Sequence, residues 1–287
     1  MKPVGVVGPG CPNQPHDVAV VQLLLNLSAP VGSLSLRIDG HLTHSTIFAI
    51  ETFQRDTVRL ARPDGLVELD SPTARTLATA AAASIQLRSK LPAAQAGDAL
   101  SDADYQRAAM ALSCEVAAVK AVSQVESAGD GFLPSKQPKI LFEAHVFSKQ
   151  THHRYDLLFP DISSRHWNRA LYRGGQREYP RLQKAMLLDR AAALGAASWG
   201  RFQILGTNYA AAGAPSLEAF IAAMFRSEGG QLDAFVAFLK STNLAEALRQ
   251  HDWAKFARGY NGPKYSERHY DLGIKEQYER FAGVVAK

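Results

Sequence analysis

The stretch EVAAVKAVSQVESAGDGF, residues 115–132, combines a helical pattern with an abrupt end. At about 100° per residue, Lys120 and Gln124 share one side of a helix, and Val119 lies on the opposite side. Glu126 projects on the side of Val119 and continues the apolar stripe. The pattern therefore predicts a helix that ends with a carboxylate turned toward the protein interior.

A carboxylate on such a stripe should lose part of its hydration, which raises its pKa and favours the protonated form. A general acid needs this property near neutral pH. From the helix alone, Glu126 is also consistent with a solvated helix end that bonds a backbone group. The glycines that follow, Gly129 and Gly131, favour a site because they allow a long ligand to approach the backbone.

The chain has 287 residues, of which 46% are hydrophobic and 21% charged, and this composition is typical of a globular protein. Its length predicts about two domains. The net charge of +5 favours polyanionic partners such as nucleic acid, an anionic membrane face or an acidic cell wall, although a generic basic surface fits equally well. Cys11 and Cys114 form no CxxC pair, and we expect unpaired thiols.

The first residues, MKPVGVVGPGCPNQ, contain no apolar run long enough for a signal peptide. No stretch approaches the roughly 20 apolar residues of a membrane span. We therefore expect a chain that is made in the cytoplasm and needs a separate agent to reach a site outside it.

Residues 1–84 predict a small module of three helices. The first helix is expected to start at an N-cap, Asp17, and the third at Ser71, with Pro72 in its first position. Asp-Gly turns at 39–40 and 64–65 each precede a short extended piece and a helix that contains threonine. The module therefore contains a weak internal repeat.

Residues 85–100 are rich in Ala, Gln, Ser and Pro and predict a linker. Residues 101–287 predict a larger domain in which alternating β-branched runs are scarce. The fold class expected for the whole chain is all-α or α-dominated. The helices predicted in the larger domain are 102–113, 115–126, 180–194, 215–228, 230–240, 243–250 and 265–283.

The segment ASWGRFQILGTNYAAAG, residues 197–213, alternates aromatic, amide and glycine residues. These are Trp199, Gly200, Phe202, Gln203, Gly206 and Asn208. Aromatic faces for stacking, amides for hydrogen bonding and glycines that leave room beside the backbone suit a neutral sugar rich in hydroxyl and acetamide groups. A helical corner with buried aromatic residues is the alternative.

Two further segments carry polar residues. ILFEAHVFSKQTHHRYD places Glu143 between apolar neighbours, which predicts a second buried carboxylate. Its histidines do not have the spacing of a zinc site, so we expect neither a metal nor a cofactor. The Tyr260-Asn261 pair could form one wall of a cleft, and a plain helix-terminating turn fits equally well.

The N-terminal pattern DGHLTHSTIFAIETFQ resembles the peptidoglycan-binding domain 1 family, a three-helix cell-wall module. The matching residues are Asp39-Gly40, Thr46, Ala49-Ile50 and Phe53-Gln54. The second glycine that usually follows the Asp-Gly turn is replaced, and Thr43 stands near its place. The resemblance implies that Asp39, Gly40 and Thr46 serve a wall-binding module.

The C-terminal part, from about Ala108 onward, resembles the N-acetylmuramidase family found in phage endolysins of Gram-negative hosts. It carries QVESAGDGF, ILFEAHVF, ASWGRFQILGTNY and ARGYNGPKY in that order. The resemblance implies a lysozyme-like helical domain with Glu126 as the catalytic acid. The substrate-binding residues that the motifs indicate are Trp199, Gly200, Gln203, Asn208, Tyr209, Tyr260 and Asn261.

The implied reaction is cleavage of the β-1,4 bond between N-acetylmuramic acid and N-acetylglucosamine in peptidoglycan. Glu143 is the first candidate for a second catalytic carboxylate, and Asp130 is the alternative. A lytic transglycosylase, which leaves a 1,6-anhydro product, and a non-catalytic wall-binding or phage-structural protein are the rival functions. An amidase or peptidase would need a zinc cluster or a Cys-His pair.

The resemblance also implies the partners and the place of action. We expect a monomer that acts on peptidoglycan in the periplasm after a separate pore opens the inner membrane. Nucleic acid is not expected as a partner, whereas the positive charge should favour contact with an anionic outer membrane.

Overall fold

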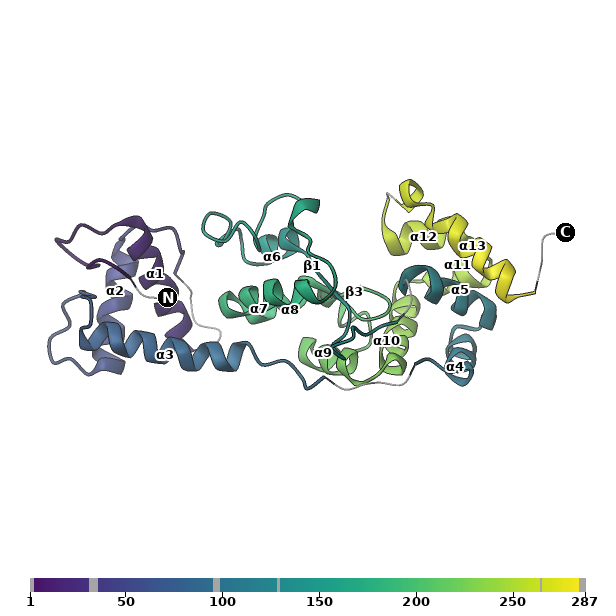
Figure 1. Ribbon diagram of the computed structural model, residues 1–287, viewed down its shortest axis with the longest axis horizontal. Helices are drawn as coiled ribbons and strands as arrows, with labels where there is room; N and C mark the ends of the chain where they lie inside the picture. The colour runs from purple at the N-terminus through teal and green to yellow at the C-terminus, as the bar shows by residue number, and fades with distance from the viewer. Residues whose placement is uncertain (1–2, 31–35, 95–98, 128–129, 264, 284–287) are drawn as a thin grey trace. The chain divides into compact units, whose positions relative to one another are not determined.

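The computed structural model describes residues 3–30, 36–94, 99–127, 130–263 and 265–283. Helices dominate these residues and the named strands form one small sheet, which confirms the α-dominated fold class (Figure 1). Two compact units interleave along the sequence. The first comprises Met1–Leu91, Ala144–Leu171 and Arg181–Ala193, and the second comprises Pro92–Glu143, Tyr172–Pro180 and Leu194–Lys287.

The first unit begins with a module of three helices, α1 (Pro15–Ser28), α2 (His44–Phe53) and α3 (Pro72–Arg88). A π-helical turn, η1 (Gln54–Val58), extends α2. Apolar side chains from each helix are fully buried where α1 packs on α2 and α3. Tertiary burial of this kind stabilises helices that would be marginal alone.

The first and third helices start in different ways, one without a side-chain cap and the other with one. Helix α1 starts at Pro15, and Asp17 lies inside its first turn, where the carboxylate accepts a hydrogen bond from the Val4 amide at 2.7 Å. The prediction of Asp17 as the N-cap is therefore wrong, because proline sets the start of the helix. Ser71 does cap α3, with Pro72 first in the helix, as predicted.

The first Asp-Gly turn is held by a buried glutamine, Gln22 of α1. Its Nε2 donates to Asp39 Oδ1 at 3.2 Å, to the His41 carbonyl at 3.0 Å and to Thr46 Oγ1 at 3.3 Å. Its Oε1 accepts from the amides of Asp39 and Gly40, both at 3.1 Å. One side chain thus ties the turn to the start of α2.

The second turn repeats this arrangement around Gln54. Its Nε2 donates to Asp64 Oδ1 at 2.7 Å, to the Leu66 carbonyl at 2.9 Å and to Thr73 Oγ1 at 3.3 Å. Its Oε1 accepts from the amides of Asp64 and Gly65 at 3.0 Å. The predicted internal repeat is confirmed, and its central element is a glutamine. The sequence analysis named Gln54 among the residues that carry the resemblance, but it did not name Gln22 or connect either glutamine with the turns.

The repeat changes the interpretation of the residues assigned to wall binding. Thr46 is 1% exposed, and Gly40 is buried with a φ of 75°, where an added Cβ would lie 2.6 Å from the Pro15 carbonyl oxygen. These two residues therefore hold the turn and the start of α2 in place, and their role in a wall-binding module stays a prediction. Asp39 is partly exposed; burial acts to raise its pKa, but hydrogen bonds from His41 and Gln22 outweigh it and the pKa is lowered.

The second unit contains the sheet and most of the remaining helices. Its strands β1 (Ile140–Phe142), β2 (Ala197–Trp199) and β3 (Ile204–Leu205) are antiparallel in that order, with Ser198 opposite both Leu141 and Leu205. Helix α5 (Val116–Ser127) packs along α13 (Tyr270–Phe281) and against α4 (Asp102–Leu112). In both units, the other elements are α6 (Ala144–Gln150), η2 (Arg169–Leu171), η3 (Gly175–Arg177), α7 (Glu178–Leu188), α8 (Arg190–Gly195), η4 (Gly206–Asn208), α9 (Leu217–Arg226), α10 (Glu228–Ser241), α11 (Leu244–Arg249), α12 (Trp253–Asn261) and η5 (Tyr265–Arg268).

Several predicted helices are divided by caps inside them. The helix predicted over 180–194 breaks at Asp189, whose carboxylate accepts from the Ala192 amide at 3.0 Å and starts α8. The helix predicted over 215–228 ends before Ser227, because this serine caps α10. Helix α6 was not predicted, and α12 ends at Asn261, where the sequence predicted a possible helix-terminating turn. In the described part of the chain no single helix is long and apolar enough to span a bilayer, although α4 and α5 together reach that composition as a pair bent by 110°.

Replacing Gln54 with alanine should destabilise the three-helix module by about 2–4 kcal/mol, because the amide of Asp64 and the buried amide of Gly65 would lose their acceptor. Hydrogen exchange of the α1 and α3 amides in the full chain measures this loss. The control is Gln86→Ala, on the exposed surface of α3, which should change stability by less than about 0.5 kcal/mol. Equal effects of the two changes would contradict the central role of Gln54.

Candidate active site

Glu126 lies in the last turn of α5, on the face that packs into the second unit. Val119 and Val122 on the same face are fully buried, and Glu126 itself is partly buried. The amide Nδ2 of Asn261, at the end of α12, donates to Glu126 Oε1 at 2.8 Å. The predicted inward orientation is confirmed, and the partner comes from a residue 135 positions further along the chain.

Burial raises the pKa of Glu126 from its ordinary value of 4.5 to about 7. The hydrogen bond from Asn261 acts in the opposite direction, because it favours the charged carboxylate. The net result is a carboxyl group that still holds its proton close to neutral pH. This property suits a group that must donate a proton and then remain as a stabilised anion.

Tyr260 fixes the end of α12 next to this carboxyl group. Its hydroxyl donates to the Phe202 carbonyl oxygen at 2.6 Å, and its ring stacks on Phe256 and meets Phe235 edge-on. Burial, together with the negative charge of Glu126, raises the pKa of Tyr260 well above its ordinary value. The hydroxyl therefore remains a donor that anchors α12, and its neighbour Asn261 is held within reach of Glu126.

The aromatic residues of the 197–213 segment belong to the core. Trp199 is 0% exposed, and its indole N–H donates to the Leu194 carbonyl oxygen at 3.0 Å. Phe202 is 1% exposed and stacks on Phe235 at 4.2 Å between ring centroids. The prediction that these rings stack on a sugar is wrong, because the β2–β3 hairpin turns both side chains into the protein.

Gly200 and Gln203 shape the turn of that hairpin. Gly200 has a φ of 70°, and a Cβ at this position would lie 2.7 Å from Gln231 Cδ. The room beside Gly200 is thus filled by the protein itself, which corrects the prediction of space for a ligand. Gln203 donates its amide to the Gly200 carbonyl at 2.8 Å and to the Lys139 carbonyl at 3.4 Å, so it holds the turn to the residue before β1.

Asn208 and Tyr209 follow directly, at the end of η4. Both are partly exposed, and the Asn208 carbonyl accepts from the Ala212 amide at 2.9 Å. Their side chains, like that of the partly exposed Gln203, are accessible enough for a hydrogen bond with a ligand. They remain candidates for substrate binding.

A buried acid that the sequence reading missed, Glu228, joins the segments around the site. Its carboxylate pairs with Arg201 at 2.9 Å, accepts from the Gly131 amide and accepts from the Leu100 amide at 3.3 Å. Arg201 also donates from Nε to Ser123 Oγ on α5 at 2.9 Å. The sequence feature that could have indicated Glu228 is Ser227, which caps α10 directly before it. The predicted helix over 215–228 ran through this cap and hid it.

Gly131 belongs to this arrangement and not to a ligand path. A Cβ there would lie 2.1 Å from Gln231 Oε1, so the close approach that its small size allows is made by Gln231. Gly129 lies outside the described residues. Asp130, the alternative second carboxylate, is exposed.

Glu143 lies between β1 and α6. Its amide donates to the Ala196 carbonyl at 2.9 Å, and its carboxylate accepts a hydrogen bond from the hydroxyl of Tyr172. The side chain is partly buried. Glu126 and Glu143 thus have different hydrogen-bond donors, Asn261 for one and Tyr172 for the other.

No group of three or more His, Cys, Asp or Glu side chains gathers as a metal site would require within the described residues. His153 of the histidine-rich segment contacts Ser148 Oγ at 2.8 Å and the Asp156 carboxylate at 3.3 Å. Burial raises the pKa of the Cys114 thiol to about 11, which makes it a poor nucleophile at neutral pH.

Comparison with known proteins places the chain in a family. The family model for N-acetylmuramidases matches residues 115–282, more than half of the chain, and takes in Glu126, Glu143 and Asn261. Among solved structures, the chain is similar to an endolysin of the Burkholderia phage AP3, with 34% identity and a TM-score of 0.61 over 98% of this chain and 100% of that one. Among curated proteins none matches the sequence.

The raised pKa of Glu126 has a consequence for stability. The unfolded chain releases this proton near pH 4.5 and the folded chain near pH 7, so stability should fall as pH rises between these values and stay constant above them. Glu126→Gln should therefore stabilise the protein by about 1–3 kcal/mol at about pH 8 and by little at about pH 4. Urea unfolding at the two pH values measures the difference.

The matched control is Glu276→Gln on the exposed surface of α13, which should leave stability nearly unchanged at both pH values. A gain for Glu126→Gln that is the same at both pH values would contradict the raised pKa.

Proposed function

Since the chain belongs to the N-acetylmuramidase family, we propose that it hydrolyses the β-1,4 bond between N-acetylmuramic acid and N-acetylglucosamine, with Glu126 as the general acid. As a glycoside hydrolase of this family it acts on peptidoglycan. The observation that carries the assignment of Glu126 is its burial beside Asn261, which leaves the carboxyl group protonated near neutral pH.

The hydrogen bond to Asn261 suggests how the proton is presented. Because Asn261 occupies Oε1 as a donor, the proton of the neutral acid is carried by Oε2. Oε2 donates to the glycosidic oxygen as positive charge builds on the sugar ring. After the transfer, the same Asn261 amide stabilises the carboxylate that remains.

Glu143 is the proposed second carboxylate of the reaction. Tyr172 holds its orientation through a hydrogen bond, which is the support expected for a base or nucleophile that must keep one geometry. In an inverting reaction Glu143 would activate a water molecule, and in a retaining reaction it would attack the sugar carbon. The exposed Asp130 remains the alternative.

The parts of the chain take the following proposed roles. Residues 1–84 bind the cell wall, residues 85–100 link, with residues 85–88 forming the last turn of α3, and residues 101–287 carry the catalytic site. Given the similarity to a phage endolysin, the chain is proposed to act as a monomeric endolysin that lyses the host from within, reaching the periplasm from the cytoplasm where it is made.

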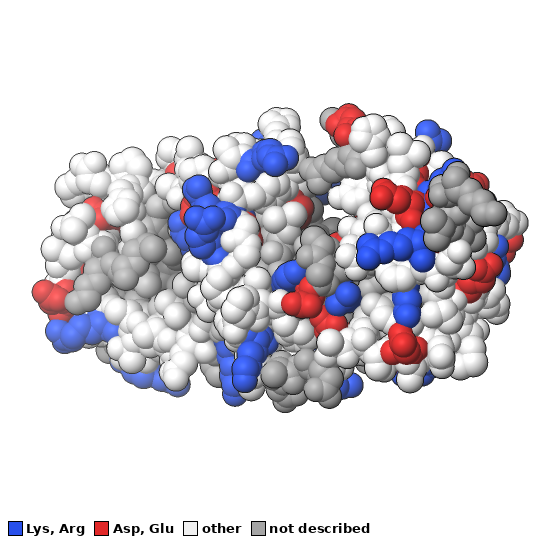
Figure 2. All heavy atoms as spheres, turned by 45° about the vertical axis from the view of Figure 1, so that its right-hand side comes forward, with Lys and Arg blue, Asp and Glu red and all other residues white. Residues whose placement is uncertain are grey.

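The positive charge is proposed to aid approach to anionic envelope polymers. On the face drawn in Figure 2, basic and acidic side chains stand in small mixed groups between uncharged areas. The net charge of +5 therefore acts there as a diffuse attraction, which salt screens over about 10 Å at 0.1 M ionic strength.

Glu126→Gln should reduce hydrolysis of purified sacculi by about 100-fold or more, because the amide cannot transfer a proton. Binding to sacculi should persist, since the change keeps the size of the side chain. Glu276→Gln is the exposed control and should keep wild-type activity. Activity of the wild type should decline as pH rises through about 7, where Glu126 loses its proton.

Mass spectrometry of the products distinguishes the reactions. Hydrolysis leaves reducing N-acetylmuramic acid ends, whereas 1,6-anhydro products would contradict it in favour of a lytic transglycosylase. Wild-type rates from Glu126→Gln would refute the assignment of the acid.

Glu143→Ala should also lower activity by about 100-fold or more if this residue completes the reaction. Azide, a small anionic nucleophile, should partly restore turnover because it can occupy the space of the missing carboxylate. Tyr172→Phe, which removes the orienting hydroxyl, should have a smaller effect. Full activity of Glu143→Ala would exclude Glu143 and leave Asp130 as the candidate.

A further inference from the structure

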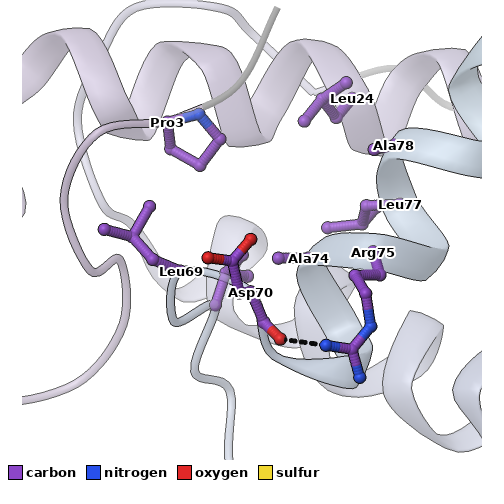
Figure 3. Close-up of a pocket in the computed structure, with 9 residues that line it drawn as sticks. Pro3, Leu24, Leu69, Asp70, Ala74, Arg75, Leu77 and Ala78 are labelled. Atoms are coloured by element: carbon purple, nitrogen blue, oxygen red, sulfur yellow. Dashed lines mark hydrogen bonds between the residues drawn. The ribbon is translucent and has the colours of Figure 1, made fainter.

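The pocket between α1 and α3 lies within the core of the three-helix module (Figure 3). Leu24, Val67 and Leu77, which line it, are buried, so packing closes its walls and it carries no ligand site. The polar interior of the second unit is more informative, because buried polar groups persist where hydrogen bonds compensate their lost hydration.

The ion pair of Arg201 and Glu228 lies inside the second unit. Arg201 Nη1 is 2.9 Å from Glu228 Oε2, and the two side chains are 11% and 3% exposed. A buried ion pair is weak evidence for stability, because the loss of hydration offsets the attraction between the charges. Its geometry is more telling, since each member also bonds a separate segment of the chain.

The two segments that the ion pair bonds lie on either side of Glu126 in the sequence. Arg201 Nε donates to Ser123 Oγ at 2.9 Å, three residues before Glu126. Glu228 Oε1 accepts from the Gly131 amide, five residues after Glu126. One ion pair therefore holds the chain both before and after the acid.

Gln231, near the start of α10, supports the same place. Its Oε1 accepts from the Arg201 amide at 2.6 Å, and its Nε2 donates to the Met224 carbonyl at 3.0 Å. The side chain is buried and passes so close to Gly131 that a Cβ there would lie 2.1 Å from Gln231 Oε1. The backbone of Arg201 and the segment after Glu126 are thus fixed together with the ion pair.

We propose that the Arg201–Glu228 ion pair positions Glu126 for the reaction. Through Ser123 and Gly131 it holds the end of α5 where the Glu126 carboxyl group is buried. Arg201, Glu228 and Ser123 are positioning residues in this proposal, because they act through the acid. The proposal rests on the proposed function of Glu126.

A looser end of α5 would expose the carboxyl group to water. Burial raises the pKa of Glu126 to about 7, and the hydrogen bond from Asn261 acts against it. The titratable neighbour on α12 is Tyr260, whose pKa is raised by its own burial and by the charge of Glu126, so it stays neutral. Loss of the hold should therefore lower the pKa of Glu126 toward its ordinary value of 4.5.

Ser123→Ala in the full chain removes the hydroxyl group that Arg201 bonds on α5. The titration of Glu126, followed by carbon-13 NMR of its carboxyl carbon, should have a midpoint lower by about one unit. The kcat on sacculi should fall about tenfold at a pH of about 6, with the apparent KM changed by less than about twofold, because the acid is displaced while the contacts to substrate remain.

Tyr105→Phe is the matched control. The Tyr105 hydroxyl bonds the same Ser123 Oγ from α4, at 3.1 Å, so this change also removes a hydrogen bond of the serine but keeps the link to Arg201. The Glu126 titration and kcat should stay near wild type. Equal effects of Tyr105→Phe and Ser123→Ala would reduce the result to a general loosening of α5 and overturn the proposal.

Arg201→Lys is the second variant. It keeps the positive charge but replaces the fork of nitrogens, which reaches Ser123 and Glu228 together, with a single nitrogen. The same lowered midpoint and reduced kcat are expected, and circular dichroism checks that each variant folds. A wild-type midpoint and a wild-type kcat in Ser123→Ala and Arg201→Lys would refute the positioning role.

The carbon-13 titration separates this proposal from the proposed reaction, because it does not depend on activity. A midpoint that stays near pH 7 in Ser123→Ala would count against the ion pair, even where Glu126→Gln abolishes hydrolysis. A wild-type rate from Glu126→Gln would count against the acid, whatever the titration of Ser123→Ala shows.

Discussion

The buried carboxylate of Glu228 is the interaction on which the arrangement of the second unit depends. Arg201, Gly131 and Leu100 come from separate segments, and each directs a donor to this one side chain. A buried acid is costly unless its oxygens are paired, so the three segments are stable together and unstable apart. Arg201 extends the constraint to α5 through Ser123, one turn before the catalytic candidate.

The chemistry of Glu126 follows from packing of this kind. Its pKa of about 7 results from burial, which needs α5 packed on α13 and the last residue of α12, Asn261, next to the carboxyl group. Tyr260 and Asn261 hold this arrangement, the first by bonding the Phe202 carbonyl and the second by bonding Glu126 itself. Tyr260 therefore anchors the end of α12, and Asn261 orients the acid.

In the three-helix module, buried polar groups also have hydrogen-bond partners, but these groups are neutral. Gln22 and Gln54 each bond several donors and acceptors at an Asp-Gly turn, because an amide side chain has both two N–H donors and a carbonyl acceptor. Because the glutamines bond them, the buried amides of Gly40 and Gly65 are not available to a ligand.

The sequence by itself determined the helical fold class, the repeat of Asp-Gly turns and the inward direction of Glu126, because helical periodicity and turn chemistry are local. The tertiary structure alone decided that Trp199 is core, that the space at Gly200 belongs to Gln231 and that Glu228 is buried. Burial and hydrogen-bond partners depend on residues far apart in the chain, and a local pattern carries no information about which of them meet.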